Sequence, residues 1–251
     1  MKIGLMDSGT GGLSVLHVAK KILPNEHYLY YADLDHCPYG KKTNEEILSY
    51  VDDAITFLKN KGCEVIVIAC NTATSVAVKD MREKYKDLRI LGMEPAVKKA
   101  LSEEESKRIL VLATPVTVKG DKLKDLLEKY DAHHQVDAVS LVKLPEYAEK
   151  LEFNSDEVHH YLKESLKNYD PCKYASIVFG CTHFNYFKDS FSSLYPHVSF
   201  IDGNVGTINN LKNYVDDEEA YKVDYYISGR EASKEEIHKM NLLLHRLEEL
   251  D

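Results

Sequence analysis

Two cysteines occupy matching places in the sequence, each directly after a short apolar run of β-branched and aromatic residues. Cys70 follows the run at 65–69, and Cys181 follows the run at 177–180. In open parallel α/β sheets, ligands bind beyond the carboxyl ends of the strands, so both thiols are expected to face a binding crevice. Amides at the start of a following helix favour the thiolate form of such a cysteine. The pair therefore indicates acid/base chemistry by two thiols.

Two further side chains are placed to exchange protons with these thiols. His183 lies two residues after Cys181, and Asp7 ends the first predicted strand, next to the strand that carries Cys70. A single Cys–His pair would suggest acyl transfer, but that reaction uses one nucleophile and leaves the second thiol unexplained. Two opposed thiols suit proton transfer at a prochiral carbon, where one thiolate removes a proton and the other thiol returns one to the opposite face. This chemistry requires no metal or organic cofactor, and we predict none.

A carbanion at that carbon would need preorganised hydrogen-bond donors around the substrate carboxylate. Hydroxyl and amide side chains of this kind stand at or near the ends of the predicted strands: Ser8, Asn71, Thr72, Thr114, Thr117 and Thr182.

The run Asp-Ser-Gly-Thr-Gly-Gly at 7–12 follows the first strand and precedes a helix. Its glycines allow a sharp turn that presents backbone N–H groups to an anion. The run has Ser14 where a dinucleotide motif has its third glycine, and it lacks the Gly-Lys-Ser/Thr ending of a phosphate-binding loop. A carboxylate-binding turn and a plain turn capped by Asp7 remain the two interpretations.

The loop at 33–40 follows the second strand. Pro38 and Gly40 predict a rigid turn that either presents Tyr39 to a ligand or simply exposes it. His36 and Cys37 are metal-binding residue types, but no second ligand pair stands at a recognisable spacing, so we predict no metal site.

Strand-like runs alternate with helical patterns along the chain. The strands are expected near 2–6, 27–33, 64–69, 88–93, 108–113, 135–140, 175–180, 197–202 and 221–228. Helices are expected at 43–60, with Thr43 and Glu46 forming a capping box, and at 116–130 and 233–248. This alternation predicts an α/β fold with mainly parallel sheets. Because the unit strand–Cys–Thr–helix occurs once in each half, we expect two pseudo-symmetric α/β lobes with the active site in the cleft between them.

Composition excludes several classes of protein. The chain of 251 residues has 44% hydrophobic residues and a net charge of −9 without basic clusters, so no nucleic-acid partner is expected. It begins directly with a strand and has no apolar run long enough to span a bilayer, so we expect a cytoplasmic protein that does not bind membranes. Five cysteines do not suggest a disulfide framework. Exposed helices such as 43–60 or 233–248 could pair two copies in a homodimer.

Taken together, five motifs resemble those of the glutamate racemases in the aspartate/glutamate racemase family. They are residues 7–12, Pro-Tyr-Gly at 38–40, Cys-Asn-Thr-Ala-Thr at 70–74, Ala-Thr-Pro-Val-Thr-Val at 113–118 and Gly-Cys-Thr-His at 180–183. Their order and spacing match over essentially the whole chain. Aspartate racemases typically carry Glu after the second Cys-Thr, where this chain has His183, so the resemblance favours glutamate.

The resemblance implies a cofactor-independent racemase that interconverts L- and D-glutamate and supplies D-glutamate for peptidoglycan. It implies a first lobe at 1–95 plus 208–251 and a second lobe at 96–207. Cys70 would take the proton from D-glutamate and Cys181 the proton from L-glutamate.

The family's other site residues carry over onto matching positions. Asp7 and His183 would assist the two thiols, and a glutamate in the segment 144–149 would join them, for which we choose Glu146 over Glu149. The substrate contacts implied are Asp7, Ser8, Tyr39, Gly40, Asn71, Thr72, Thr114, Thr117, Thr182 and His183. The alternatives are a racemase for aspartate or another amino acid, and an inactive amino-acid-binding regulator.

Overall fold

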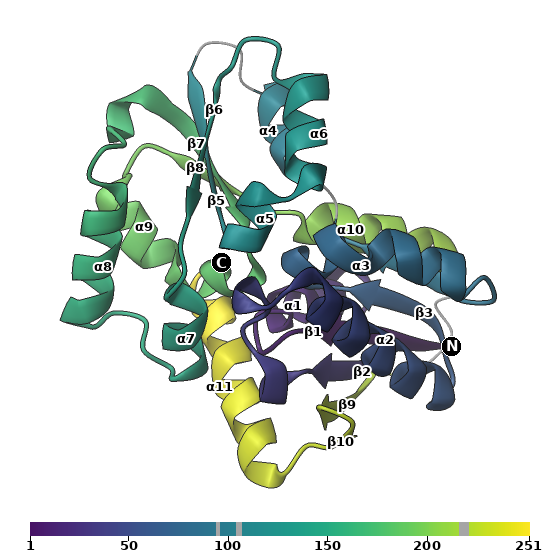
Figure 1. The fold of residues 1–251 in the computed structure, drawn as a ribbon. Coiled ribbons are helices and arrows are strands. Elements are labelled where there is room, and N and C mark those ends of the chain that lie inside the picture. Colours follow the sequence, from purple (N-terminus) through teal and green to yellow (C-terminus); the bar gives the residue numbers. More distant parts are fainter. Residues whose placement is uncertain (94–95, 104–106, 216–220) are drawn as a thin grey trace.

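A computed structural model describes residues 1–93, 96–103, 107–215 and 221–251. Two mainly parallel β-sheets form its framework, and helices cover the faces of each sheet (Figure 1). The α/β class predicted from the alternating pattern is therefore confirmed.

The first sheet has six strands in the order β10-β9-β2-β1-β3-β4. Its strands are β1 (Lys2–Asp7), β2 (His27–Ala32), β3 (Cys63–Ile68), β4 (Arg89–Gly92), β9 (Lys222–Ile227) and β10 (Arg230–Glu231). All neighbours are parallel except β9 and β10. The central strand β1 is buried from its second residue to its last, which explains the continuous apolar run in its sequence.

The second sheet has four parallel strands in the order β6-β5-β7-β8. They are β5 (Arg108–Ala113), β6 (Val136–Ser140), β7 (Tyr174–Gly180) and β8 (Ser199–Ile201). The order repeats that of β2-β1-β3-β4 in the first sheet. The register irregularity between Lys2 and Ile3, where β1 pairs with β3, also recurs between Arg108 and Ile109, where β5 pairs with β7. The predicted pseudo-symmetry is thus visible in strand order and pairing.

Helices cover both faces of the first sheet. One face is covered by α1 (Leu13–Ile22), α10 (Asn204–Leu211) and α11 (Lys234–Glu249), and the other by α2 (Asn44–Asn60) and α3 (Asn71–Lys84). The predicted capping box of α2 is present, because Thr43 accepts from the Glu46 N–H while Glu46 accepts from the Thr43 N–H.

The second sheet has longer helices on both sides and short ones near the first sheet (Figure 1). The longer helices are α4 (Ala96–Glu103) and α6 (Asp121–Tyr130) on one side and α8 (Asp156–Leu166) and α9 (Lys188–Leu194) on the other. The short α-helices are α5 (Pro115–Lys119) and α7 (Leu144–Glu149). The described 3₁₀ segments are η1 (Leu34–His36), η2 (Tyr39–Lys41), η3 (Pro171–Lys173), η4 (Thr182–Phe187) and η5 (Lys212–Tyr214).

Two element predictions need correction. The helix predicted at 116–130 is split into α5 and α6, because Gly120 adopts an extended conformation between them and glycine disfavours a helix interior. The short strand β10 was not predicted. Strand β9 pairs with β2 although it follows the second sheet in sequence. The lobe boundaries 1–95 plus 208–251 and 96–207 remain a prediction, and residue 95 lies outside the described residues.

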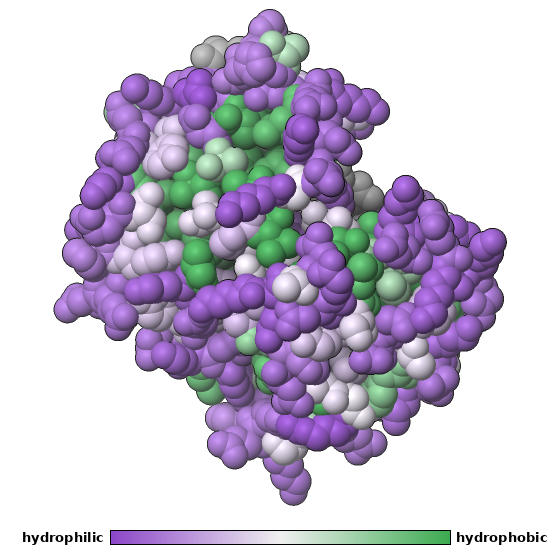
Figure 2. Space-filling view, in the orientation of Figure 1, coloured by the Kyte–Doolittle hydropathy of each residue, from purple (hydrophilic) through white to green (hydrophobic). Residues whose placement is uncertain are grey.

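The surface is largely hydrophilic, and hydrophobic residues show between the helices over the strands of the second sheet (Figure 2). Among the helices in the described residues, none is both long and apolar enough to cross a bilayer.

Candidate active site

A pocket with about 270 Å³ of empty space lies where the carboxyl ends of β1, β3, β5 and β7 meet. It is lined by Ser8, Pro38, Tyr39, Gly40, Cys70, Asn71, Thr72, Thr114, Pro145, Cys181, Thr182 and His183. Both strand-end cysteines therefore face one pocket, as their positions in the sequence predicted.

Cys70 is the N-cap of α3 and is almost fully buried. The Ala73 N–H donates to its Sγ at 3.4 Å, and the Ser8 hydroxyl oxygen lies 3.6 Å from Sγ. Burial, followed by the charge of Asp7, nevertheless raises the pKa of Cys70 to about 12. We expected the start of the helix to favour the thiolate, but burial outweighs that effect and favours the thiol form of Cys70 in the unliganded pocket.

Cys181 belongs to a chain of contacts that ends on a carboxylate. Its Sγ lies 3.9 Å from His183 Nδ1, and His183 Nε2 lies 2.9 Å from Glu149 Oε1. Burial tends to lower the pKa of His183, but the contacts with Cys181 and Glu149 raise it to about 10. His183 is therefore a protonated imidazolium at neutral pH, with its Nδ1 3.9 Å from the Cys181 sulfur.

Glu149 is held by several donors. The N–H and the hydroxyl of Thr10 donate to Oε1 at 2.7 and 2.9 Å, and Lys239 Nζ lies 3.0 Å from Oε2. Burial acts to raise the pKa of Glu149, but His183 and then Lys239 lower it to about 2. The carboxylate is ionised at neutral pH and can stabilise the imidazolium.

Asp7 is fully buried at the end of β1. It accepts hydrogen bonds from the Gly9 N–H at 2.8 Å and from the Thr182 hydroxyl at 3.1 Å. Burial raises its pKa, opposed by the charge of His183. Among the described contacts Asp7 acts on Cys70 through its charge, while its hydrogen bonds join β1 to the start of η4.

Two glycines of the 7–12 run lie so close to other residues that a Cβ atom at either position would clash. A Cβ on Gly11 would lie 2.4 Å from Thr182 Oγ1 and 2.8 Å from the His183 backbone nitrogen. A Cβ on Gly9 would lie 2.5 Å from Glu149 Oε1. The glycine-rich turn therefore lets the start of η4 pack against the first sheet.

Three threonines meet across the pocket wall. The hydroxyl of Thr72 lies 2.8 Å from that of Thr114, which lies 3.1 Å from that of Thr117. Gly40 packs against Thr114, and the Tyr39 hydroxyl donates to Asp33 at 2.6 Å. Tyr39 is thus a fixed wall of the pocket instead of an exposed turn residue.

The sequence of this chain matches known proteins over most of its length. The sequence profile described as Asp/Glu/Hydantoin racemase matches residues 3–210. The chain belongs to this racemase family. A glutamate racemase from Lachnospira eligens is 48% identical over 266 residues, covering 100% of both chains. One from Campylobacter curvus is 54% identical over 218 residues, covering 84% of this chain and 82% of the relative.

A solved structure shows the same fold. Escherichia coli glutamate racemase in complex with L-glutamate and the activator UDP-MurNAc-ala superposes with a TM-score of 0.82 at 26% identity. The match covers 98% of this chain and 94% of that chain. The resemblance stated from the motifs is confirmed.

Of the two glutamates on α7, Glu149 and not Glu146 contacts His183. The Glu146 side chain is 40% exposed and forms an ion pair with Lys41, whereas the Glu149 side chain is 18% exposed and contacts His183. The two glutamates stand three residues apart on one short helix, and only the packing of α7 against η4 turns Glu149 inward. We therefore transfer the proposed role from Glu146 to Glu149.

Most other predicted residues are brought together. Asp7 does not line the pocket itself but accepts a hydrogen bond from the lining residue Thr182. Thr117 likewise lies outside the lining and contacts the hydroxyls of the lining residues Thr72 and Thr114. Their roles toward a substrate remain predictions.

Cys37 lies on the same side of the site. Its Sγ, a Glu149 oxygen and a His183 nitrogen lie within 4.8 Å of one another. Glu149 Oε1 also receives the hydrogen bonds from Thr10 and the contact with His183. His36 instead lies 2.9 Å from Asp33.

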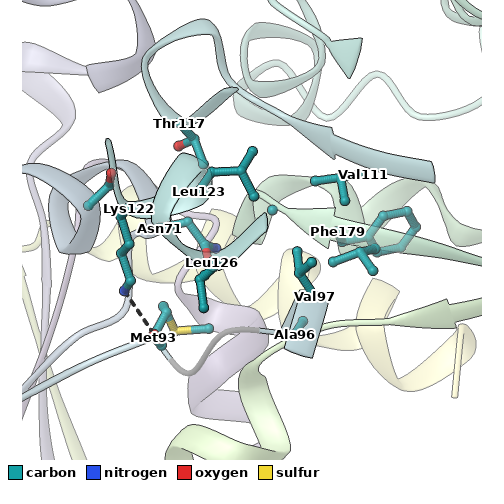
Figure 3. A pocket seen from close by; sticks show the side chains of 13 residues that line it. Asn71, Met93, Ala96, Val97, Val111, Thr117, Lys122, Leu123, Leu126 and Phe179 are labelled. Carbon is teal, nitrogen blue, oxygen red and sulfur yellow. Dashed lines mark hydrogen bonds between the residues drawn. The ribbon is translucent and has the colours of Figure 1, made fainter. Parts of the chain in front are cut away.

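An apolar cavity with about 500 Å³ of empty space adjoins the pocket, and Asn71 lines both (Figure 3). Its side chains come from α3, α4, α5, α6, β5 and β7, and Lys122 reaches the Met93 carbonyl at 3.4 Å.

Sequence reasoning missed Thr10 and Lys239. Thr10 stands within the glycine-rich run, three residues after Asp7, and this position was a usable signal. Lys239 lies in the C-terminal helix, 90 residues from Glu149, and no local pattern connects the two.

Proposed function

We propose that this chain interconverts L- and D-glutamate through two cysteine thiols. The observation that carries the proposal is the placement of Cys70 and Cys181, on equivalent strands of two similar sheets, in one pocket. Relatives at about half identity bear the name glutamate racemase, and the related Escherichia coli structure contains L-glutamate.

Each reaction transfers one proton from and one proton to the α-carbon. In the L-to-D direction, the Cys181 thiolate takes the α-proton of L-glutamate, and the C–H electron pair stays on carbon. The Cys70 thiol then donates its proton to the opposite face. The reverse direction exchanges the two roles, and neither direction changes the oxidation state of any group.

The surrounding groups supply charge and hydrogen bonds. In the D-to-L direction, Cys181 gives up its proton to the α-carbon, and the imidazolium of His183, stabilised by Glu149, can then return a proton to the Cys181 thiolate. No lysine or arginine occurs among the pocket-lining residues in the described part of the chain. Substrate carboxylates would therefore be bound by the hydroxyls of Ser8, Thr72, Thr114 and Thr182, the Asn71 amide and backbone N–H groups, with the His183 imidazolium as the cation among the lining residues.

The decisive assay incubates purified protein with L-glutamate, and separately with D-glutamate, in deuterated water. Loss of optical activity and incorporation of deuterium at the α-carbon are followed together, with L-aspartate as the parallel substrate. We expect racemisation and exchange with both glutamate enantiomers.

Other outcomes of this assay would support one of the two alternative functions. Exchange with aspartate alone would identify a racemase of different specificity. Binding of glutamate without exchange would identify an amino-acid-binding protein, and both results would contradict the proposal.

The scheme uses no metal or organic cofactor, so a chelator should leave the rate unchanged. We further propose that the D-glutamate supplies peptidoglycan synthesis in the cytoplasm. Pairing of two copies through α2 or α11 likewise remains a prediction.

A further inference from the structure

The C-terminal helix α11 brings a positive charge to the contact chain of the active site. Lys239 Nζ lies 3.0 Å from Glu149 Oε2, and its side chain is 30% exposed. The next residue, Met240, is buried together with Leu243, Leu244 and Leu247 on the same helix. The apolar face of α11 therefore anchors the helix that carries Lys239 against the core.

The two oxygens of Glu149 have different partners. Oε1 accepts from Thr10 and lies 2.9 Å from His183 Nε2, while Oε2 faces Lys239. A carboxylate held at both oxygens cannot rotate, so its lone pairs stay directed at the imidazole. Without the ammonium, Oε2 would be a largely buried and unpaired charge.

We propose that Lys239 is a positioning residue for the Cys181 half of the reaction, acting through Glu149 and His183. The inference rests on the proposed racemase function. Cys70 has no corresponding partner on α11 among the described contacts, so the effect of Lys239 should be confined to one of the two proton transfers.

Several titratable groups face Glu149 from the elements packed against it. They are His183 on η4, Lys239 on α11, Asp7 and Tyr30 on β1 and β2, Cys37 after η1, and Tyr186 on η4. Of these, Lys239 and the protonated His183 carry positive charge. Removing Lys239 leaves the carboxylate with the His183 imidazolium as its one cation among these groups.

The test compares Lys239→Met, which keeps the stem and removes the charge, with Lys239→Arg, which keeps the charge. Lys234→Met is the matched control, because Lys234 is exposed on the same helix and forms no ion pair among the described residues. We expect Lys239→Met to lower kcat from L-glutamate about tenfold, while the other two variants stay within about threefold of the wild type.

Isotope effects assign the loss to one proton transfer. L- and D-glutamate have equal free energies, so any variant must change kcat/KM equally in both directions. If Lys239 serves Cys181, the primary isotope effect with α-deuterated L-glutamate rises in Lys239→Met and that with α-deuterated D-glutamate falls. A general loosening of the fold would lower the rate without this opposed change.

The carboxyl carbon resonance of Glu149, assigned by its loss in Glu149→Gln, gives a readout that needs no turnover. Its titration should move to higher pH in Lys239→Met, and an acid limb in kcat should move in the same direction. The proposal is wrong if Lys239→Met leaves the titration and the isotope effects unchanged, or if Lys234→Met reproduces the loss. If the wild type shows no turnover, the racemase proposal fails, and the titration still decides the role of Lys239.

Discussion

At the residue scale, the site contains two thiols of similar position and different surroundings. Cys70 contacts a helix amide and a serine hydroxyl, whereas Cys181 contacts a histidine that is itself bound to a carboxylate. The difference arises because different residues pack against the ends of strands β3 and β7. The start of α3 approaches the first lobe's own Ser8, and η4 approaches Glu149 on α7.

Replacement of either thiol tests the two-base scheme. Cys70→Ala and Cys181→Ala should each lower racemisation by at least about a thousandfold, because one proton transfer then has no acid or base. Cys172→Ala, at an exposed thiol, should keep the wild-type rate. Polarimetry measures the rates and circular dichroism checks the fold. Near-normal racemisation in both directions by either active-site variant would contradict the scheme.

Glu149 and Glu146 form a matched pair for the carboxylate that supports His183. Glu149→Gln should lower kcat about a hundredfold, because the imidazolium loses its anionic partner. Glu146→Gln should change it less than about threefold, since an exposed ion pair with Lys41 contributes little. Equal losses in the two variants would contradict the assignment of this role to Glu149.

The ion pair between His183 and Glu149 predicts how the free energy of unfolding depends on pH. The pKa of His183 is raised from 6.5 to about 10, so its contribution is complete below pH 6.5 and disappears as the pH rises through about 10. The pKa of Glu149 is lowered from 4.5 to about 2, so its contribution is complete above pH 4.5 and disappears as the pH falls through about 2.

Glu149→Gln should therefore lower the free energy of unfolding most between pH 4.5 and 6.5, and progressively less as the pH rises toward 10. Urea unfolding of both proteins across this range measures the difference. A deficit independent of pH would show that the ion pair does not contribute.

At the element scale, helix starts are determined locally and can be tested separately from the chemistry. Thr43→Ala removes the side-chain acceptor at the start of α2 and should lower the free energy of unfolding by about 1 kcal/mol. Ser193→Ala, on the exposed surface of α9, is the control and should change it by less than about 0.5 kcal/mol. Racemisation should be unaffected by both, because α2 begins outside the pocket. An equal loss of stability in the two variants would contradict the cap.

Elements were predictable where a local pattern decides them. The capping box at Thr43, the strands flanking each cysteine and the glycine-rich turn could all be read from neighbouring residues. The split at Gly120 and the short β10 could not, since apolar spacing continues across the glycine and a two-residue strand exists only through pairing with β9.

At the scale of the whole molecule, the pocket belongs to neither sheet alone. Ser8, Cys70 and Thr72 come from one sheet, while Thr114, Cys181 and His183 come from the other. A bound ligand should therefore stabilise the contact between them. At a concentration about 100 times Kd, D-glutamate should add about 2.7 kcal/mol to the free energy of unfolding.

Thermal unfolding with increasing D-glutamate measures this gain, and D-alanine is the control because it lacks the second carboxylate. A melting temperature that does not respond to D-glutamate at any concentration would contradict glutamate binding in the pocket.

The sequence by itself determined which strand ends carry thiols, hydroxyls and Asp7, because these features depend on short segments and on the alternation of strands and helices. Tertiary structure alone decided that Glu149 and not Glu146 faces His183, since residues three apart on a helix share nearly the same side and only packing distinguishes them. It alone brought Lys239 to the same carboxylate. A contact between residues 90 positions apart depends on how α11 packs across the two sheets, and no local pattern records that packing.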